Sequence, residues 1–233
     1  MTDERGLHKG YWDSIPSDSV YPTELSKMLL MEDAEAAARE GEADTQEVLA
    51  LVPPLPANAR MVELAAGVGR FTPHMVRLAG SGGLLVAYDF VADFCDKNRE
   101  QCQQLGLTNV EVRAKDVLHA ELPNELDLVF ASWIFMYLAN DEVHLTLAKI
   151  ARALRPGGWL VFRESCVKVP VEHVGDWPRF PGEHPCRYRS GQWYSKALRA
   201  YGGRTTHDAQ ALKVWDDPTD PNEQLAWVWQ NDG

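Results

Sequence analysis

The stretch ELAAGVGRF, residues 63–71, carries the residue types best suited to holding a ligand. It follows an apolar run at 61–64 and precedes a helical pattern, which predicts a turn between a strand and a helix. Small residues at 65–67 and Gly69 let the backbone approach a ligand closely, and the helix start offers free N–H groups. By itself, such a loop is also compatible with an ordinary tight turn.

Two carboxylates strengthen the ligand interpretation. Asp89 ends the apolar run 84–88 and lies 20 residues after Gly69, where a nucleotide-binding sheet places the acid that binds ribose hydroxyls. Asp116 follows the run 110–114, where a carboxylate can accept the exocyclic amine of an adenine. The sequence therefore predicts a nucleoside site beside the glycine-containing loop.

Together with LRPGG at 154–158, this ordered set over residues 60–165 resembles class I methyltransferases that use S-adenosylmethionine. The resemblance departs at Ala65, where the family usually has its first glycine. Alanine still allows the turn if its φ stays negative, so we expect weaker tolerance at this position rather than loss of binding. Dinucleotide oxidoreductases share the sheet, but their G-x-G-x-x-G pattern is missing, because the loop reads G-x-G-R and is followed by Pro73 and not by a third glycine. The resemblance implies a cofactor site of Trp12, Met28, Glu63, Ala65, Gly67, Gly69, Arg70, Asp89, Phe90, Asp116, Val117 and Trp133.

Arg70 has two interpretations. An arginine at a helix start is usually solvated and slightly unfavourable against the helix dipole. In the GAGIGR-type methyltransferases, which this loop resembles, that arginine pairs with the carboxylate of the cofactor's methionine portion, and a guanidinium fork suits a carboxylate.

These residues need a sheet to position them, and the pattern from residue 60 predicts one. Strands are expected at 61–64, 84–88, 110–114, 126–131 and 159–163, with helices at 73–78, 92–104, 141–154 and 192–201. Two further strand-like runs, 209–215 and 225–230, flank the turn-rich residues 216–223 and predict an antiparallel hairpin. The expected class is α/β: a Rossmann-like, mostly parallel seven-stranded sheet with helices on both faces.

The whole chain, residues 1–233, is expected to form a single domain with three segments: 1–52, 60–165 for cofactor binding, and 166–233 for the substrate and the hairpin. Residues 1–27 are polar but carry Tyr11, Trp12 and Tyr21, which predicts a lid over a site. Residues 28–52 predict two helices separated by a turn at 41–44.

Three later motifs give a second, narrower resemblance. FASWIFMYLANDEV at 130–143, FRESC at 162–166 and HPCRYR at 184–189 are similar to the first catalytic domain of plant phosphoethanolamine methyltransferases and their nematode counterparts. This resemblance spans nearly the whole chain and implies a phosphoethanolamine acceptor. It departs at His184 and Arg187, where the family motif has asparagine and histidine.

Carried over by position, Trp133 and Tyr137 would wall the methyl-transfer site. The resemblance implies substrate contacts from Arg163, Glu164, Arg187, Tyr188 and Arg189. An alkyl amine must lose a proton before it attacks, and the hydrogen-bonding candidates are Tyr137, Tyr11 and Tyr21. Structural alternatives stay open: Trp133 and Tyr137 as core residues, and Glu164 as an ion-pair partner of Arg163.

The bulk composition limits the partners. The chain has 23 basic and 34 acidic residues, and its formal net charge of -11 opposes binding to nucleic acid. We expect no metal, no membrane segment, a cytoplasmic location and reduced thiols at all four cysteines. The sequence does not fix the oligomeric state.

Three other functions remain open. One is methyl transfer to another small amine or to a thioether carboxylate. The second is protein N-terminal methylation, which would need an acidic channel for the peptide's positive end. The third is a binding protein without turnover, against which Asp89, Asp116 and Arg70 argue.

Overall fold

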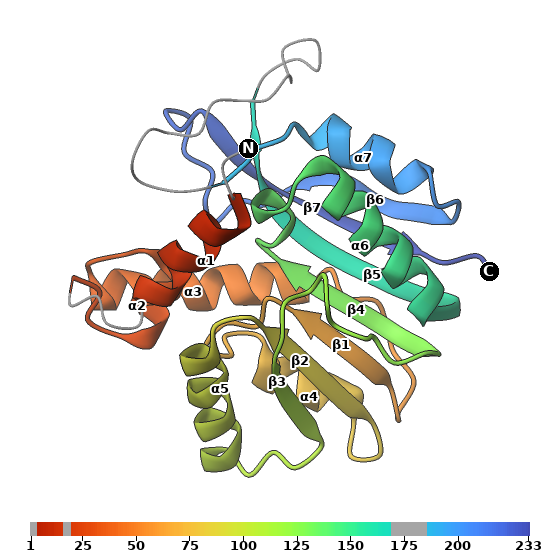
Figure 1. Ribbon diagram of the computed structural model, residues 1–233, viewed down its shortest axis with the longest axis horizontal. Coiled ribbons are helices and arrows are strands. Elements are labelled where there is room, and N and C mark those ends of the chain that lie inside the picture. Colours follow the sequence, from red (N-terminus) through yellow and green to blue (C-terminus); the bar gives the residue numbers. More distant parts are fainter. Residues whose placement is uncertain (1–3, 16–19, 169–185) are drawn as a thin grey trace.

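The computed structural model describes residues 4–15, 20–168 and 186–233, which build one seven-stranded sheet with helices around it (Figure 1). The strand order is β3-β2-β1-β4-β5-β7-β6. The strands are β1 (Arg60–Leu64), β2 (Leu84–Asp89), β3 (Val110–Ala114), β4 (Leu126–Ser132), β5 (Leu154–Val167), β6 (Arg204–Ala211) and β7 (Asn222–Gln230). The helices are α1 (Glu4–Ser14), α2 (Glu24–Leu29), α3 (Ala34–Leu49), α4 (Thr72–Ala79), α5 (Ala92–Gln104), η2 (Phe135–Tyr137), α6 (Asn140–Ala153) and α7 (Gly191–Arg199).

The first five strands run parallel, so their carboxyl ends share one edge of the sheet. Leu64 in β1 lies beside Tyr88 in β2 and Ala131 in β4, and Asp89 lies beside Ala114 in β3. Strand β7 pairs antiparallel with both β5 and β6. The predicted fold class and C-terminal hairpin are confirmed, although β6 spans Arg204–Ala211 rather than 209–215.

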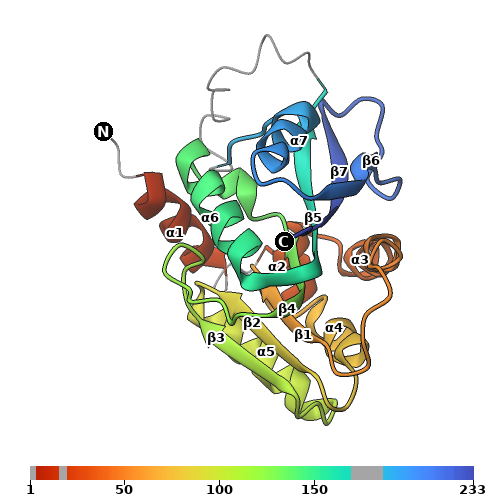
Figure 2. The ribbon, with the colours of Figure 1, turned by 90° about the vertical axis from the view of Figure 1, so that its right-hand side faces the viewer.

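Both faces of the sheet are covered, which explains the continuous apolar runs of its central strands. Helices α6 and α7 pack on one face through residues such as Leu147 and Tyr194. On the other face, α3 and α4 bury Val48 and Met75 against Leu128 and its neighbours (Figure 2). None of the helices in the described ranges is long and apolar enough to cross a bilayer.

The predicted turn at 41–44 is wrong. Helix α3 runs unbroken from Ala34 to Leu49, and the break lies before it, where Asp33 caps the helix by accepting the N–H groups of Glu35 and Ala36. Gly41 serves close packing instead of a turn, because an added Cβ would lie 3.0 Å from the Leu29 side chain on α2. This continuous helix carries a site residue described below.

Candidate functional site

The loop after β1 bends through backbone conformations that favour glycine. Gly67 and Gly69 have φ values of 55° and 93°. Ala65 also has a positive φ, 55°, so the condition of a negative φ at this position is not met. The loop adopts the glycine geometry of its first position without a glycine there, at a steric cost.

Asp89 lies at the carboxyl end of β2 and faces this loop. Its carboxylate accepts the N–H of Gly67 (2.8 Å) and the N–H of Val91 (2.9 Å). Burial raises the pKa of Asp89 to about 6, although these N–H groups oppose the shift. A buried carboxylate held this way by the backbone is well placed to accept hydroxyl groups of a ligand.

Asp116 is brought to the same edge of the sheet. The N–H of Lys115 donates to the Asp89 carbonyl at 2.7 Å, which ties the two strand ends together. The Asp116 carboxylate accepts the N–H of Leu118 at 2.9 Å. The Lys149 ammonium, a residue that sequence reasoning missed, binds three carbonyls of the same turn, those of Val117, Leu118 and Ala120.

Glu63 lies behind the loop and is 1% exposed. It accepts the Thr72 hydroxyl at 2.7 Å, and Asn98 donates to that hydroxyl at 2.9 Å. Burial raises the pKa of Glu63 to about 8, so the protonated acid is the dominant form at neutral pH. A cationic ligand at the loop would favour the ionised form instead.

The N-terminal segment packs onto the loop. Ile15, Val68, Val91 and Phe94 form a small core, and the residues packed around it are Tyr11, Trp12, Tyr21, Met28, Leu30 and Phe90. Met28 covers the loop closely, because a Cβ at Gly67 would lie 2.4 Å from its sulfur. The residues predicted as a lid therefore contact those predicted to bind the cofactor.

Tyr137 lies where the lid meets the segment after β4. Its ring makes edge contacts with Trp12 (5.7 Å between centroids) and with His8 (6.0 Å). Burial raises the pKa of Tyr137 well above its ordinary value, with Cys186, Tyr188 and Tyr11 as neighbours that add to the shift. Its hydroxyl is thus protonated at neutral pH and suits hydrogen bonding better than proton abstraction. No motif or spacing in the sequence pointed to His8.

Glu164 holds the segment that carries Tyr137. It is fully buried and accepts the N–H groups of Ile134 (2.9 Å), Phe135 (2.7 Å) and Met136 (3.2 Å). Burial raises its pKa to about 7, against the effect of those donors. These partners of the carboxylate are backbone groups of the protein itself, and the expected substrate contact of Glu164 stays a prediction.

Arg189 binds the carbonyl groups of the same segment. Its two terminal nitrogens donate to the carbonyls of Phe135 and Leu138, and its Nε donates to Asn140. The residue is 3% exposed. Its fork therefore faces protein acceptors, and binding of a substrate anion by Arg189 stays a prediction.

Arg187 and Tyr188 remain the candidates for an anionic group. The N–H of Arg187 donates to the Met136 carbonyl, which places these residues beside the segment of Tyr137. Both side chains are partly exposed. His184 of the same motif lies outside the described residues.

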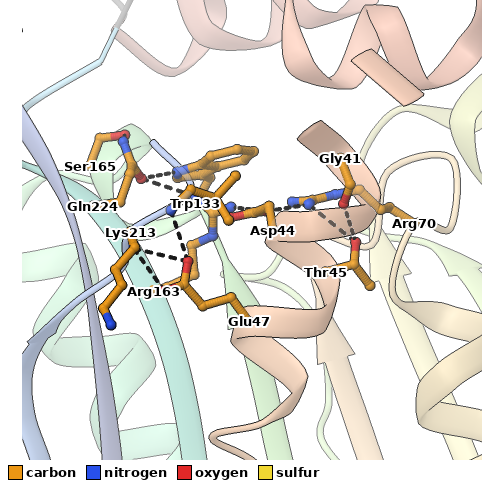
Figure 3. A network of polar contacts seen from close by, with 11 residues as sticks. Gly41, Asp44, Thr45, Glu47, Arg70, Trp133, Arg163, Ser165, Lys213 and Gln224 are labelled. Carbon is orange, nitrogen blue, oxygen red and sulfur yellow. Dashed lines mark hydrogen bonds and ion pairs between the residues drawn. The ribbon is translucent and has the colours of Figure 1, made fainter. Parts of the chain in front are cut away.

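Arg70 and Arg163 share one carboxylate, Asp44 of α3 (Figure 3). Arg163 is fully buried, and its guanidinium stacks on the Trp133 ring at 3.3 Å from the ring centroid. The Trp133 indole N–H and Arg163 Nη1 both donate to Gln224. The substrate role of Arg163 stays a prediction beside these contacts. Asp44 was missed because its partners are distant in the sequence.

The charged groups along this edge of the sheet suit S-adenosylmethionine. Two guanidinium groups against one carboxylate leave one positive charge, which complements a ligand carboxylate near Arg70. At the other end of the edge, Asp89 and Asp116 offer acceptors for hydroxyl and amine groups. Within residues 4–15, 20–168 and 186–233, no cluster of three or more His, Cys, Asp or Glu side chains is arranged to hold a metal ion.

Comparisons with known proteins agree with this geometry. Residues 61–158 match a family model described as a methyltransferase domain. Phosphoethanolamine N-methyltransferase 1 of Arabidopsis thaliana is 30% identical over 98% of this chain and 45% of its own length. Phosphoethanolamine N-methyltransferase 1 of Caenorhabditis elegans is 32% identical over 91% of this chain and 42% of its own length.

Among solved structures, the chain is similar to phosphoethanolamine N-methyltransferase 1 of Haemonchus contortus in complex with phosphoethanolamine and S-adenosylhomocysteine. The TM-score is 0.76 at 26% identity, covering 97% of this chain and 48% of that protein. The chain thus spans about half the length of the curated relatives it matches.

Proposed function

Because the chain carries a class I methyltransferase domain of the S-adenosylmethionine-dependent type, we propose that it methylates the amine of phosphoethanolamine or of a methylated derivative. The observation that carries the proposal is that the predicted cofactor residues and the predicted acceptor residue Tyr137 lie at the same edge of the sheet. The cofactor residues at the ends of β1 and β2 lie under the same N-terminal lid that touches Tyr137.

When bound, S-adenosylmethionine supplies a methyl group activated by its sulfonium. In the proposal, Asp89 accepts the ribose hydroxyls, and Asp116 with Val117 binds the adenine. Gly67 and Gly69 let the loop approach the ligand, with Ala65 between β1 and these glycines. Arg70 binds the carboxylate of the methionine portion, with Glu63 close to its ammonium group.

Tyr137 and Tyr11 orient the acceptor amine by hydrogen bonding, and Tyr21 contributes to the lid. Burial keeps the Tyr137 hydroxyl protonated, so it aligns the amine rather than removing its proton. Arg187 and Tyr188 bind the anionic end. The aromatic rings of Trp12 and Tyr137, which contact each other, favour a cationic centre beside them and exclude water.

Phosphate is favoured over carboxylate by the named relatives, whereas Arg187 serves either anion. A small amine or thioether carboxylate is therefore the second candidate acceptor. Peptide N-termini are less suited, because the acceptor side presents Arg187 rather than an acidic channel. We also expect a cytoplasmic location, where reducing conditions keep the four buried cysteines as thiols.

The cofactor half of the proposal is tested with Asp89→Asn. Loss of a charged hydrogen-bond acceptor weakens binding by about 1.5 to 3 kcal/mol. Calorimetry with S-adenosylhomocysteine should show this loss. Asp127→Asn is the matched control, because Asp127 is also a buried strand residue but lies at the opposite edge of the sheet. There it accepts the backbone N–H of Arg60 and the Nε–H of Arg155. Equal affinity of Asp89→Asn and the wild type would refute the assigned site.

A further inference from the structure

Asp44 is a fully buried carboxylate that serves two arginines at once. It lies in α3, accepts Arg70 from the cofactor loop and accepts Arg163 from β5 (Figure 3). Burial raises the pKa of Asp44, but Arg163 and Arg70 outweigh it and hold this pKa below the ordinary value. Burial lowers the pKa of Arg163 to about 9, so it stays protonated at neutral pH. The cluster therefore carries one net positive charge.

The two arginines differ in how firmly they are held. Arg163 is fixed by Asp44, by Gln224 at 3.0 Å and by its stack on Trp133. Arg70 has its own contacts: its Nη1 also donates to Thr45 at 3.4 Å, and its guanidinium lies 4.2 Å from the Phe71 ring centroid and 5.2 Å from that of Trp133. It nevertheless lies at the edge of the cluster with its side chain 10% exposed, whereas that of Arg163 is 0% exposed. Arg70 is consequently the partner that can turn toward a ligand.

If Arg70 left Asp44 for a ligand, no buried charge would lose its last ion-pair partner. When Arg70 turns to a ligand carboxylate, Asp44 stays paired with Arg163. Each guanidinium then has a carboxylate of its own, whereas in the ligand-free protein the two share Asp44. Removing one partner from a buried ion pair is normally costly because it leaves an uncompensated charge. The second arginine avoids that cost here.

We propose that Asp44 is an internal counter-ion that occupies Arg70 in the ligand-free protein and is displaced from it by the carboxylate of the cofactor. Asp44 then pairs with Arg163 alone and fixes the guanidinium beneath Trp133. Asp44 is thus a positioning residue that lowers cofactor affinity by competition and links the cofactor loop to the acceptor side. This inference rests on the proposed role of Arg70.

The test compares two ligands that differ only in the carboxylate: S-adenosylhomocysteine and S-adenosyl-3-thiopropylamine, its decarboxylated form. Asp44→Asn removes the competitor, so it should bind S-adenosylhomocysteine at least about five-fold more tightly and leave the affinity for the decarboxylated ligand within about two-fold. Arg163→Gln leaves Arg70 as the sole partner of Asp44. It should weaken S-adenosylhomocysteine selectively, by about ten-fold.

The double variant Asp44→Asn with Arg163→Gln removes one charge of each sign and guards against misfolding of Asp44→Asn alone. It should regain the affinity that Arg163→Gln loses. Glu47→Gln is the control, because Glu47 lies one turn along α3 and accepts the N–H groups of Lys213 and Val214. Its ligand preference should equal that of the wild type.

Equal changes for both ligands in the Asp44 variants would mean that Asp44 is only structural, and the proposal would fall. Selective weakening of S-adenosylhomocysteine by Asp44→Asn would also overturn it, since Asp44 would then assist the carboxylate. If the wild type binds neither ligand, the proposed function fails instead, which separates the two outcomes.

Discussion

Glu164 and Arg189 both bind the short backbone segment 134–138, Glu164 as a hydrogen-bond acceptor and Arg189 as a donor. Glu164 accepts its N–H groups at Ile134, Phe135 and Met136, while Arg189 donates to its carbonyls at Phe135 and Leu138. The segment carries Tyr137 at its end. Because both side chains are buried and hydrogen-bonded to the segment, they fix the position of Tyr137 more firmly than the short helical turn alone does.

We therefore expect Arg189→Lys to lower kcat. Lysine keeps the charge but lacks the planar fork that reaches two carbonyls and Asn140, so Tyr137 loses its alignment. The turnover number should fall about ten-fold while KM for the acceptor changes little, as steady-state kinetics would show. A selective rise in KM would instead support direct anion binding by Arg189.

Arg187→Ala should show the opposite division between the two kinetic parameters. Arg187 is partly exposed beside the segment of Tyr137 and is proposed to bind the anion in ground and transition states alike. Loss of such uniform binding raises KM and spares kcat. Wild-type KM in this variant would remove Arg187 from the site.

Ala65→Gly should stabilise the protein. The positive φ of Ala65 strains an L-residue, and glycine adopts this conformation freely. After the entropy cost of glycine, we expect a gain of about 0.5 kcal/mol in the free energy of unfolding, measured by urea denaturation. The neighbouring Ala66 has no positive φ, so Ala66→Gly should destabilise. A loss of stability in Ala65→Gly would show that its methyl packing outweighs the strain.

Stability should fall as the pH rises from about 5 to 8. Burial raises the pKa of Glu63, Glu164 and Asp89 to about 8, 7 and 6. The folded state then binds more protons than the unfolded state in this window, and each rise in pH favours unfolding. Thermal unfolding of the ligand-free protein at several pH values measures the effect.

Glu63→Gln separates this effect from other titrations. The amide still accepts the Thr72 hydroxyl but has no proton to lose, so Tm should vary less between pH 6 and 8 than in the wild type. Exposed Glu121→Gln should keep the wild-type pH dependence. An identical pH profile in Glu63→Gln would rule out this glutamate as a source.

The sequence predicts the parts of the site that depend on local strand-to-helix geometry. The loop and Asp89 follow the buried strands β1 and β2, Asp116 follows the edge strand β3, and parallel pairing brings the three together. Asp44 was not predicted as a site residue, because its partners Arg70 and Arg163 lie 26 and 119 residues away in the sequence. Gly41 was misinterpreted for a related reason: its packing against α2, invisible in a local pattern, overrides its turn preference.

The roles of Glu164 and Arg189 illustrate the same limit. Their residue types favour substrate binding, but a buried backbone segment offers the same hydrogen-bonding chemistry as an anion or an amine. Only the tertiary contacts show which partner each side chain has.

The central claim is tested most directly by incubating the protein with methyl-labelled S-adenosylmethionine and phosphoethanolamine and following the label by NMR. The proposed function predicts label on the nitrogen of phosphoethanolamine, with S-adenosylhomocysteine formed in equal amount, and little transfer to ethanolamine, which lacks the anion. Equal methylation of ethanolamine, or no transfer to phosphoethanolamine while a small carboxylate-bearing acceptor is methylated, would contradict it.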